Sequence, residues 1–325
     1  MSIYQNSYST VDDLLNDVFD HLLKETHTVR ASRGTFTELI GQSFTLTNPL
    51  ARLSRTEKKG TPFSALGELL WYLSGSNDLD FIEYYLPRYK DDSDDNLTVH
   101  GGYGPRLFKM RGEINQIENV LNLLKNKQTS RRAVIQLFDA SDITADFKEI
   151  PCTCSIQFLI RDQKLNMYVS MRSNDAYWGL PHDIFSFTML QEIIARKLGV
   201  DLGQYYHSVG SLHLYDNQKV NAQQYLDEGF QSTTIAMPPM PLGDPFPSLE
   251  VVKIQEKLIR TTEETIIDYL ECGEKYWCDL IRLLSIHKLL KYNKPLDIEN
   301  VKKDIDHRYL TYINKRLSTL QKYEK

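Results

Sequence analysis

The sequence predicts an α+β fold with a helical C-terminal extension. Three features support this prediction. Helix-like and strand-like segments alternate in the first part of the chain, β-like segments dominate from Arg131, and the last part is helical in pattern after a proline-rich connection. With 325 residues, the chain can form one large domain with a full core, or one domain with an appendage.

The first part of the chain is predicted to contain three helices, a strand region and an acidic loop. Apolar residues recur at helical spacing in Val11–Lys24, Pro62–Ser74 and Ile114–Lys127. Ser9 and Thr10 precede the first helix and are suited to cap it. Gly34–Leu46 mixes threonine, phenylalanine and isoleucine with glycine, which is typical of strand and turn, and Asp91–Asp95 is a polar acidic loop.

The middle of the chain is predicted to form strands and one long helix. The strands are expected at Ala133–Leu137, Cys154–Ile160, Leu165–Met171 and His207–Tyr215. Arg161–Lys164 is short enough to be the turn that joins two of them. Ile184–Leu198 is long and largely apolar, which predicts a helix in the core.

The last part of the chain is predicted to be helical. Met237–Pro247 holds five prolines and is expected to be an extended connection. Helices are expected after it at Glu256–Leu270, Tyr276–Leu290 and Val301–Leu320. We therefore predict a catalytic domain over residues 1–272 and a helical extension over residues 273–325, with a boundary near Gly273.

Charge and composition narrow the class of protein. The net charge of −5 argues against general binding of polymeric nucleic acid, although a local basic pocket for a small anion remains possible. The first residues do not resemble a signal peptide, and no apolar stretch is long enough to span a bilayer. Four cysteines in a chain of this length do not indicate a disulfide scaffold. We expect a cytoplasmic protein.

Cysteine and arginine residues are the first candidates for chemistry. Cys152, at the start of a predicted strand, is a possible nucleophile, although a lone cysteine is more often buried and inert. The cysteine spacing lacks the paired pattern that zinc prefers, so no metal is expected. Arg131, Arg132 and Arg172 suit phosphate binding, although each taken singly is more often a solvated surface charge.

Five segments together form a recognisable series. They are Glu68–Leu73, Pro151–Phe158, Arg172–Asp175, Gly179–Asp183 and Gly210–Tyr215. With a few changes they resemble the Glu-Leu-Leu-Trp-Phe-Leu, Pro-Cys-His-x-x-x-Gln-Phe, Arg-Ser-x-Asp, Gly-Leu-Pro-Phe-Asn and Gly-Asp-x-His-x-Tyr motifs of thymidylate synthases. Order and spacing agree from about Arg30 to Tyr225, which argues against coincidence.

The resemblance implies a fold and a reaction. The fold would be thymidylate synthase-like, with a large mixed sheet and flanking helices. The chain would transfer a one-carbon unit from 5,10-methylenetetrahydrofolate to C5 of a pyrimidine nucleoside monophosphate. Cys152 would add to C6 of the base, and Glu68 would act as a general acid–base through ordered water. Taken alone, Glu68 fits a structural carboxylate paired with a lysine at the edge of the core better than a catalytic group.

The resemblance also implies binding roles. Phosphate would be bound by Arg172 and Ser173, together with Arg131 and Arg132 reaching across from a partner subunit, so a homodimer is implied. Arg30 resembles a further, flexible phosphate arginine, with Arg33 as a close competitor. The remaining roles fall to His213 and Tyr215 for the sugar, Asp175 for the pterin, and Gln157, Tyr103 and Gly179 for the rest of the pocket. A lone His213 would otherwise fit a hydrogen-bonded core histidine.

Departures from the motifs bear on the substrate. Synthases have asparagine at the position of Asp183, and an amide matches the edge of uracil. A carboxyl group can accept from the cytosine amine and, when protonated, donate to N3, so Asp183 favours CMP or dCMP. A neutral exchange of Asn and Asp in a loop is the simpler alternative. Thr153 and Ser211, in place of the usual His and Asp, also resemble the deoxycytidylate and cytidylate hydroxymethylases.

Hydroxymethyl transfer is therefore the predicted reaction, with water completing it. The segment Tyr89–Gly101 is rich in Asp and lacks tryptophan, and the chain ends in polar residues, which both suit a wetter site. Two alternatives stay open: a thymidylate synthase that methylates dUMP, and a non-catalytic nucleotide-binding protein on the same fold. The sequence does not choose between ribose and deoxyribose.

Overall fold

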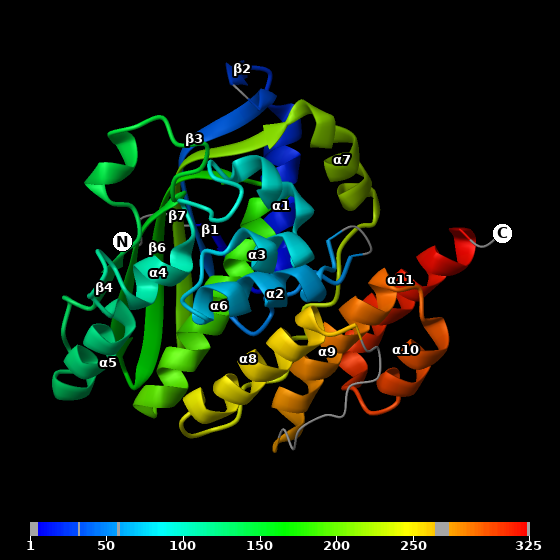
Figure 1. Ribbon diagram of the computed structural model, residues 1–325. Helices are drawn as coiled ribbons and strands as arrows, with labels where there is room; N and C mark the ends of the chain where they lie inside the picture. The colour runs from blue at the N-terminus through cyan, green and yellow to red at the C-terminus, as the bar shows by residue number, and fades with distance from the viewer. Residues whose placement is uncertain (1–5, 32, 57–58, 264–272, 324–325) are drawn as a thin grey trace.

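A mixed sheet forms the centre of the protein in the computed structural model, which describes residues 6–31, 33–56, 59–263 and 273–323. Within these residues the sheet has seven strands (Figure 1): β1 (Asn6–Tyr8), β2 (Thr28–Ala31), β3 (Gly34–Leu46), β4 (Val134–Gln136), β5 (Thr153–Arg161), β6 (Lys164–Asp175) and β7 (Asp201–Tyr215). Their order is β1-β3-β7-β6-β5-β4, with β2 paired to β3. The predicted α+β class and the large mixed sheet are confirmed.

Strand pairing brings distant parts of the chain together at the middle of the sheet. β3 and β7 are antiparallel, whereas β6 and β7 are parallel, so both β6 and β7 end beside one another at Asp175 and His213. β5 and β6 form the predicted hairpin. Asp162 and Gln163 in its turn both have positive φ, as a two-residue turn that matches the strand twist requires.

Helices pack on one face of the sheet and on one another. Their bounds are α1 (Val11–Lys24), α2 (Pro62–Leu73), α3 (Leu79–Tyr85), α4 (Tyr103–Phe108), α5 (Gln116–Asn126), α6 (Gly179–Leu198), α7 (Lys219–Asp227), α8 (Phe246–Thr261), α9 (Lys275–Lys291), α10 (Pro295–Lys302) and α11 (Leu310–Tyr323). A short 3₁₀ helix, η1, covers Pro87–Asp92. α6 lies along β6 and β7, and α2 packs over α6 (Figure 1). This layering buries most of α6 and places its first turn beside the ends of the two strands.

The other face of the sheet is open at the β4–β5–β6 side. Val134, Gln157 and Tyr168 lie directly across from one another on these three strands. Val134 and Tyr168 are exposed, and residues along β6 alternate between buried and more exposed. A sheet face with exposed apolar side chains of this kind is available for contact with another surface.

Several predicted elements are confirmed, and others required correction. α1 has the predicted bounds, with Thr10 accepting a hydrogen bond from the Asp13 amide at 3.1 Å. α6 begins five residues earlier than predicted, because Pro181 is tolerated in a first helical turn. Part of the predicted acidic loop belongs to η1, and the sequence reading missed β1, β2, α3, α4 and α7.

The C-terminal helices are confirmed in kind but not in all bounds. α8 begins at Phe246, well before the predicted Glu256, and the rest of that predicted helix beyond residue 263 lies outside the described residues. The single predicted helix Val301–Leu320 is wrong, because it is divided into α10 and α11 by a turn where Asp306 caps the Arg308 amide at 2.9 Å.

α9 joins the C-terminal helices to the rest of the protein. It packs against α2 and α8, and its buried Trp277 belongs to the same hydrophobic core as α6. The Tyr276 hydroxyl lies 3.7 Å from the sulfur of Met189 on α6. The helices are therefore packed onto the main fold, while the domain boundary near Gly273 stays a prediction.

Candidate active site

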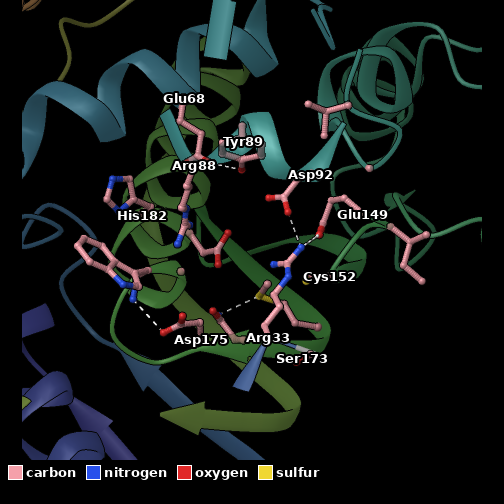
Figure 2. Close-up of a pocket in the computed structure, with 18 of the residues that line it drawn as sticks. Arg33, Glu68, Arg88, Tyr89, Asp92, Glu149, Cys152, Ser173, Asp175 and His182 are labelled. Carbon is pink, nitrogen blue, oxygen red and sulfur yellow. Dashed lines mark hydrogen bonds and ion pairs between the residues drawn. The ribbon is translucent and has the colours of Figure 1, made fainter. Parts of the chain in front are cut away.

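One cavity of about 670 Å³ opens where β6 and β7 end, under α2 and η1 (Figure 2). It brings together ten predicted site residues from separate motifs: Glu68, Tyr103, Cys152, Arg172, Ser173, Asp175, Gly179, Asp183, His213 and Tyr215. The pairing of Ser173 with Ser211 and of Asp175 with His213 across β6 and β7 places the Arg-Ser-x-Asp and histidine motifs side by side. These ten residues therefore line one cavity.

Four predicted residues do not line this cavity. Arg30 is exposed within β2, and Arg33 in the following turn lines the cavity instead, so the preference for Arg30 is corrected in favour of its competitor. Gln157 donates to the carbonyl of Arg131 at 2.8 Å, outside the cavity. Arg131 and Arg132 are exposed. These two arginines were predicted to bind phosphate in the cavity of a partner subunit. A single chain does not test that prediction.

Cys152 lies at the start of β5, in the cavity wall. Its sulfur is 3.7 Å from Nη2 of Arg172. Burial, and then the charge of Glu149, raise the pKa of the Cys152 thiol to about 12, although Arg172 acts in the opposite direction. The thiol therefore must lose its proton before it can act as a nucleophile at neutral pH.

Arg33 and Arg172 are the cations nearest to this thiol, and both have partners. Nη2 of Arg33 lies 2.5 Å from Asp92 and 3.1 Å from Glu149 (Figure 2). Arg172 donates to the carbonyls of Ile150 and Pro151, each at 3.0 Å. Arg172 thus holds the backbone before Cys152, whereas Arg33 is held through its Nη2 by two carboxylates.

Glu68 projects from α2 into the opposite side of the cavity, beside η1 (Figure 2). Its carboxylate accepts a hydrogen bond from the Tyr89 hydroxyl at 2.6 Å. Burial raises the pKa of Glu68, against the opposing effects of this hydrogen bond and of the Arg88 charge. A carboxyl group whose pKa is shifted toward neutrality can both give and take protons, which suits a general acid–base.

Asp183 and Gly179 come from the first turns of α6. Burial, and then the charge of Glu68, raise the pKa of Asp183 well above its ordinary value, although Arg88 and a hydrogen bond with Asn174 oppose the shift. A Cβ atom at Gly179 would lie 2.7 Å from Oδ1 of Asn174, so a side chain there would displace the Asn174 amide. Asp183 therefore holds its proton to a higher pH than an ordinary carboxyl group, and when protonated it offers the cavity one donor and one acceptor.

Asp175, at the end of β6, shapes the turn that leads into α6. Its carboxylate accepts from the amides of Tyr177 and Trp178 at 2.8 and 3.0 Å. The Trp178 ring remains partly exposed beside the cavity. Asp175 therefore holds an aromatic surface at the edge of the site.

A comparison with protein families identifies the chain's relatives. The family model for thymidylate synthase matches residues 11–256. The chain belongs to the thymidylate synthase family. The resemblance seen in the motifs is thereby confirmed, and the helices from α9 onward lie beyond the matched region.

Three curated relatives are phage proteins named deoxyuridylate hydroxymethyltransferase. Identity is 36% over 163 residues with the protein of Pseudomonas phage M6, covering 49% of this chain and 46% of the relative. It is 34% over 196 residues with that of Delftia phage PhiW-14, covering 56% and 54%. It is 29% over 226 residues with that of Bacillus phage SP01, covering 66% and 59%. The chain thus spans about half the length of the curated relatives it matches.

This thymidylate synthase family member also has cavity residues that sequence reasoning missed. They include Arg88, Tyr89, Asp92, Glu149, Trp178 and His182. Arg88, Tyr89 and Asp92 fall in or beside the segment that was interpreted as an acidic loop, where the pattern gave no sign of a helical turn.

Among the described residues, no helix is long and apolar enough to cross a membrane.

Proposed function

We propose that the chain is a folate-dependent 5-hydroxymethyltransferase acting on a pyrimidine nucleoside 5′-monophosphate. One observation carries the proposal: Cys152, Glu68 and Asp183 open into the same cavity. A pyrimidine needs these three groups around its ring, as a nucleophile for C6, an acid–base near C5, and a polar partner for its C4–N3 edge. The names of the three relatives support hydroxymethyl transfer.

The nucleotide would bind along the ends of β6 and β7. Its phosphate would lie against Arg33, Arg172 and Ser173, and would compete with Asp92 and Glu149 for the Arg33 guanidinium. His213 and Tyr215, whose rings meet edge to face at 5.1 Å, would bind the sugar hydroxyl. This placement would direct the base toward Cys152.

Cys152 would form the covalent bond that activates the base. Its thiolate adds to C6, the electrons of the C5–C6 double bond move toward C5, and C5 becomes a carbon nucleophile. Arg172, 3.7 Å from the sulfur, would stabilise the thiolate. Glu68 would remove the C5 proton in a later step and pass it to the departing tetrahydrofolate. At the end of the reaction the sulfur of Cys152 would leave C6 as a thiolate, and the C5–C6 double bond would form again.

The cavity residues fit a bound folate. The partly exposed Trp178 ring offers a stacking surface, and Asp175 lies next to it. Trp71 lies in the cavity wall, and its buried indole N–H has no hydrogen-bond partner among the described residues. A bound ligand could supply that partner. When bound, 5,10-methylenetetrahydrofolate would supply the one-carbon unit that becomes attached to C5.

The side of the cavity next to Glu68 is polar, which favours the addition of water to the exocyclic carbon as the last chemical step. Glu68, Arg88, Tyr89, Asp91 and Asp92 line this side. Glu68 would hold a water molecule there and accept its proton as the oxygen bonds to the exocyclic carbon. A hydroxymethyl product would follow, and no hydride transfer would be needed.

Two bases remain candidates for the substrate. The carboxyl group of Asp183 favours a cytidylate, CMP or dCMP, on the argument from its hydrogen-bonding edge. When neutral, however, that group offers one donor and one acceptor, as an amide does, and can match uracil equally. Because the relatives are named for deoxyuridylate, we propose dUMP as the first candidate and a cytidylate as the second.

The experiment that tests the proposal is a product assay. Purified protein is incubated with methylenetetrahydrofolate and with dUMP, dCMP or CMP in parallel. We expect a 5-hydroxymethyl nucleotide by mass spectrometry, together with tetrahydrofolate. A 5-methyl product with dihydrofolate would indicate a thymidylate synthase instead, and the absence of any product would favour a non-catalytic nucleotide-binding protein.

Arg33 provides a direct test of the phosphate site. Replacing Arg33 with Met is expected to raise the KM for the nucleotide about 10- to 100-fold, because a charge-assisted hydrogen bond to phosphate is lost. Arg30→Met is the matched control, since Arg30 is an exposed arginine three residues away that does not line the cavity. A larger effect of Arg30→Met would restore Arg30 as the phosphate ligand.

A homodimer and a separate helical extension belong to the same proposal. The exposed Val134 follows Arg131 and Arg132 closely in the chain, and its strand neighbour Gln157 donates to the carbonyl of Arg131, so a partner on this face would bring the two arginines to an interface. The helices over 273–325 would then form an addition to the catalytic domain over 1–272. The mass of the protein in solution would test the dimer.

A further inference from the structure

A chain of buried polar side chains lies directly behind Asp183. The Tyr205 hydroxyl is 2.8 Å from Nδ1 of His207, and Nε2 of His207 is 3.3 Å from Nδ2 of Asn174. Asn174 in turn lies beside Asp183 around Gly179, where a Cβ atom would be 2.7 Å from Oδ1 of Asn174 and 3.5 Å from Oδ2 of Asp183. Tyr205 and His207 are fully buried, and Asn174, which is 2% exposed, lies where this series of side chains meets the cavity wall.

The histidine in this chain is held as a neutral ring. His207 stacks on Phe44 with ring centres 4.7 Å apart and planes 6° from parallel, and burial lowers the pKa of His207 to about 3. A neutral imidazole has one donor and one acceptor nitrogen. The hydrogen bond made with Tyr205 therefore determines what His207 offers to Asn174.

Asn174 is confined on both sides. Its Nδ2 faces His207 and the sulfur of Met171, which lies 3.2 Å away. Its Oδ1 faces Gly179, where a Cβ atom would be only 2.7 Å from it. The amide consequently cannot turn freely, and it meets Asp183 in one orientation.

Asp183 is the end of the chain that reaches the cavity. A neutral carboxyl group has two unlike oxygens, and a bond to one of them decides which faces a ligand. Buried polar networks that are fully paired fix a single arrangement, since an unpaired member is costly. The same four side chains thus connect the core of the sheet to the site of base recognition.

We propose that Tyr205, His207 and Asn174 are positioning residues that fix the orientation of Asp183 and thereby set the preference between uracil and cytosine nucleotides. This inference rests on the proposed function, in which Asp183 faces the base. It goes further by assigning base selection to Asn174 in the cavity wall and to Tyr205 and His207, which lie in the core of the sheet and do not line the cavity.

Nucleotide binding to a His207→Phe variant tests the inference. The phenylalanine keeps a flat ring on Phe44 and removes both nitrogens. The Kd values for dUMP and dCMP are measured by calorimetry without folate, for wild type and variant. We expect the ratio of the two Kd values to move at least about fivefold toward 1, because Asp183 can then present either oxygen to the base.

Two further variants separate positioning from packing. Tyr205→Phe removes only a hydroxyl and should shift the same ratio in the same direction by a smaller factor, even if His207→Phe fails to fold. Phe44→Leu disturbs the stacking on His207 but no hydrogen bond, so it should lower the melting temperature and leave the ratio unchanged. Equal weakening of both nucleotides in the hydrogen-bond variants would overturn the inference, as would a wild-type ratio near 1.

Binding and chemistry can fail separately in this design. A wild-type protein that binds one base selectively but forms no product would contradict the proposed reaction. The Kd ratios of the variants would still decide the role of Tyr205, His207 and Asn174. A wild-type protein that makes product while the variants keep its base preference would contradict only the inference.

Discussion

Replacing Cys152 with Ala is expected to lower product formation by at least about 10⁴-fold, because no other group can form the covalent bond to C6. Binding of the nucleotide without folate should change little, since the residues proposed to contact the phosphate, the sugar and the base edge are other members of the cavity lining. Initial rates and calorimetric Kd values measured on the same preparation check both statements.

Cys154→Ala is the matched control for this variant. Cys154 is a free cysteine two residues along the chain, and it does not line the cavity. Its replacement should leave the rate within a few-fold of wild type. If Cys152→Ala retained most of the activity, covalent catalysis by this thiol would be excluded, and an equal loss in both variants would point to damage to β5.

Glu68→Gln is expected to lower the turnover rate by about 10²- to 10⁴-fold, the usual contribution of a general acid–base. The glutamine can still accept the hydrogen bond from Tyr89, so the nucleotide Kd should stay close to wild type. Release of the C5 hydrogen into solvent, followed with nucleotide labelled at C5, measures the step assigned to Glu68. Unchanged release would remove Glu68 from the mechanism.

The same variant should be more stable than wild type at alkaline pH. Because burial raises the pKa of Glu68, the folded protein binds more protons than the unfolded chain between the ordinary pKa and the raised one. The free energy of unfolding of wild type therefore falls as pH rises through this interval. Glu68→Gln lacks this loss, so its melting temperature should exceed that of wild type at pH 8.

The pH series also contains its own control. Near pH 4, Glu68 is protonated in both states, and the melting temperatures of variant and wild type should converge. Glu113→Gln, at an exposed glutamate far from the cavity lining, should follow wild type at every pH. A variant that is less stable than wild type across the whole range would show that the carboxylate of Glu68 is stabilised by its surroundings.

The sequence by itself determined the features that depend on neighbouring residues. The helix Val11–Lys24 and its cap at Thr10 follow from local spacing and hydrogen bonding, and both have the predicted bounds. The motifs around Cys152 and Asp183 are also short and continuous, so a single segment carries enough information to recognise them. The family assignment rests on the same kind of local evidence.

Only the tertiary structure decided how these segments meet. Arg33 rather than Arg30 faces the cavity because the β2–β3 turn carries it there. His207 could not be linked to Asp183 from the sequence, because their connection depends on the parallel pairing of β6 with β7 and on Asn174 between them. The physical reason is that register and packing join residues tens of positions apart, and local patterns do not encode which of two nearby side chains reaches a shared cavity.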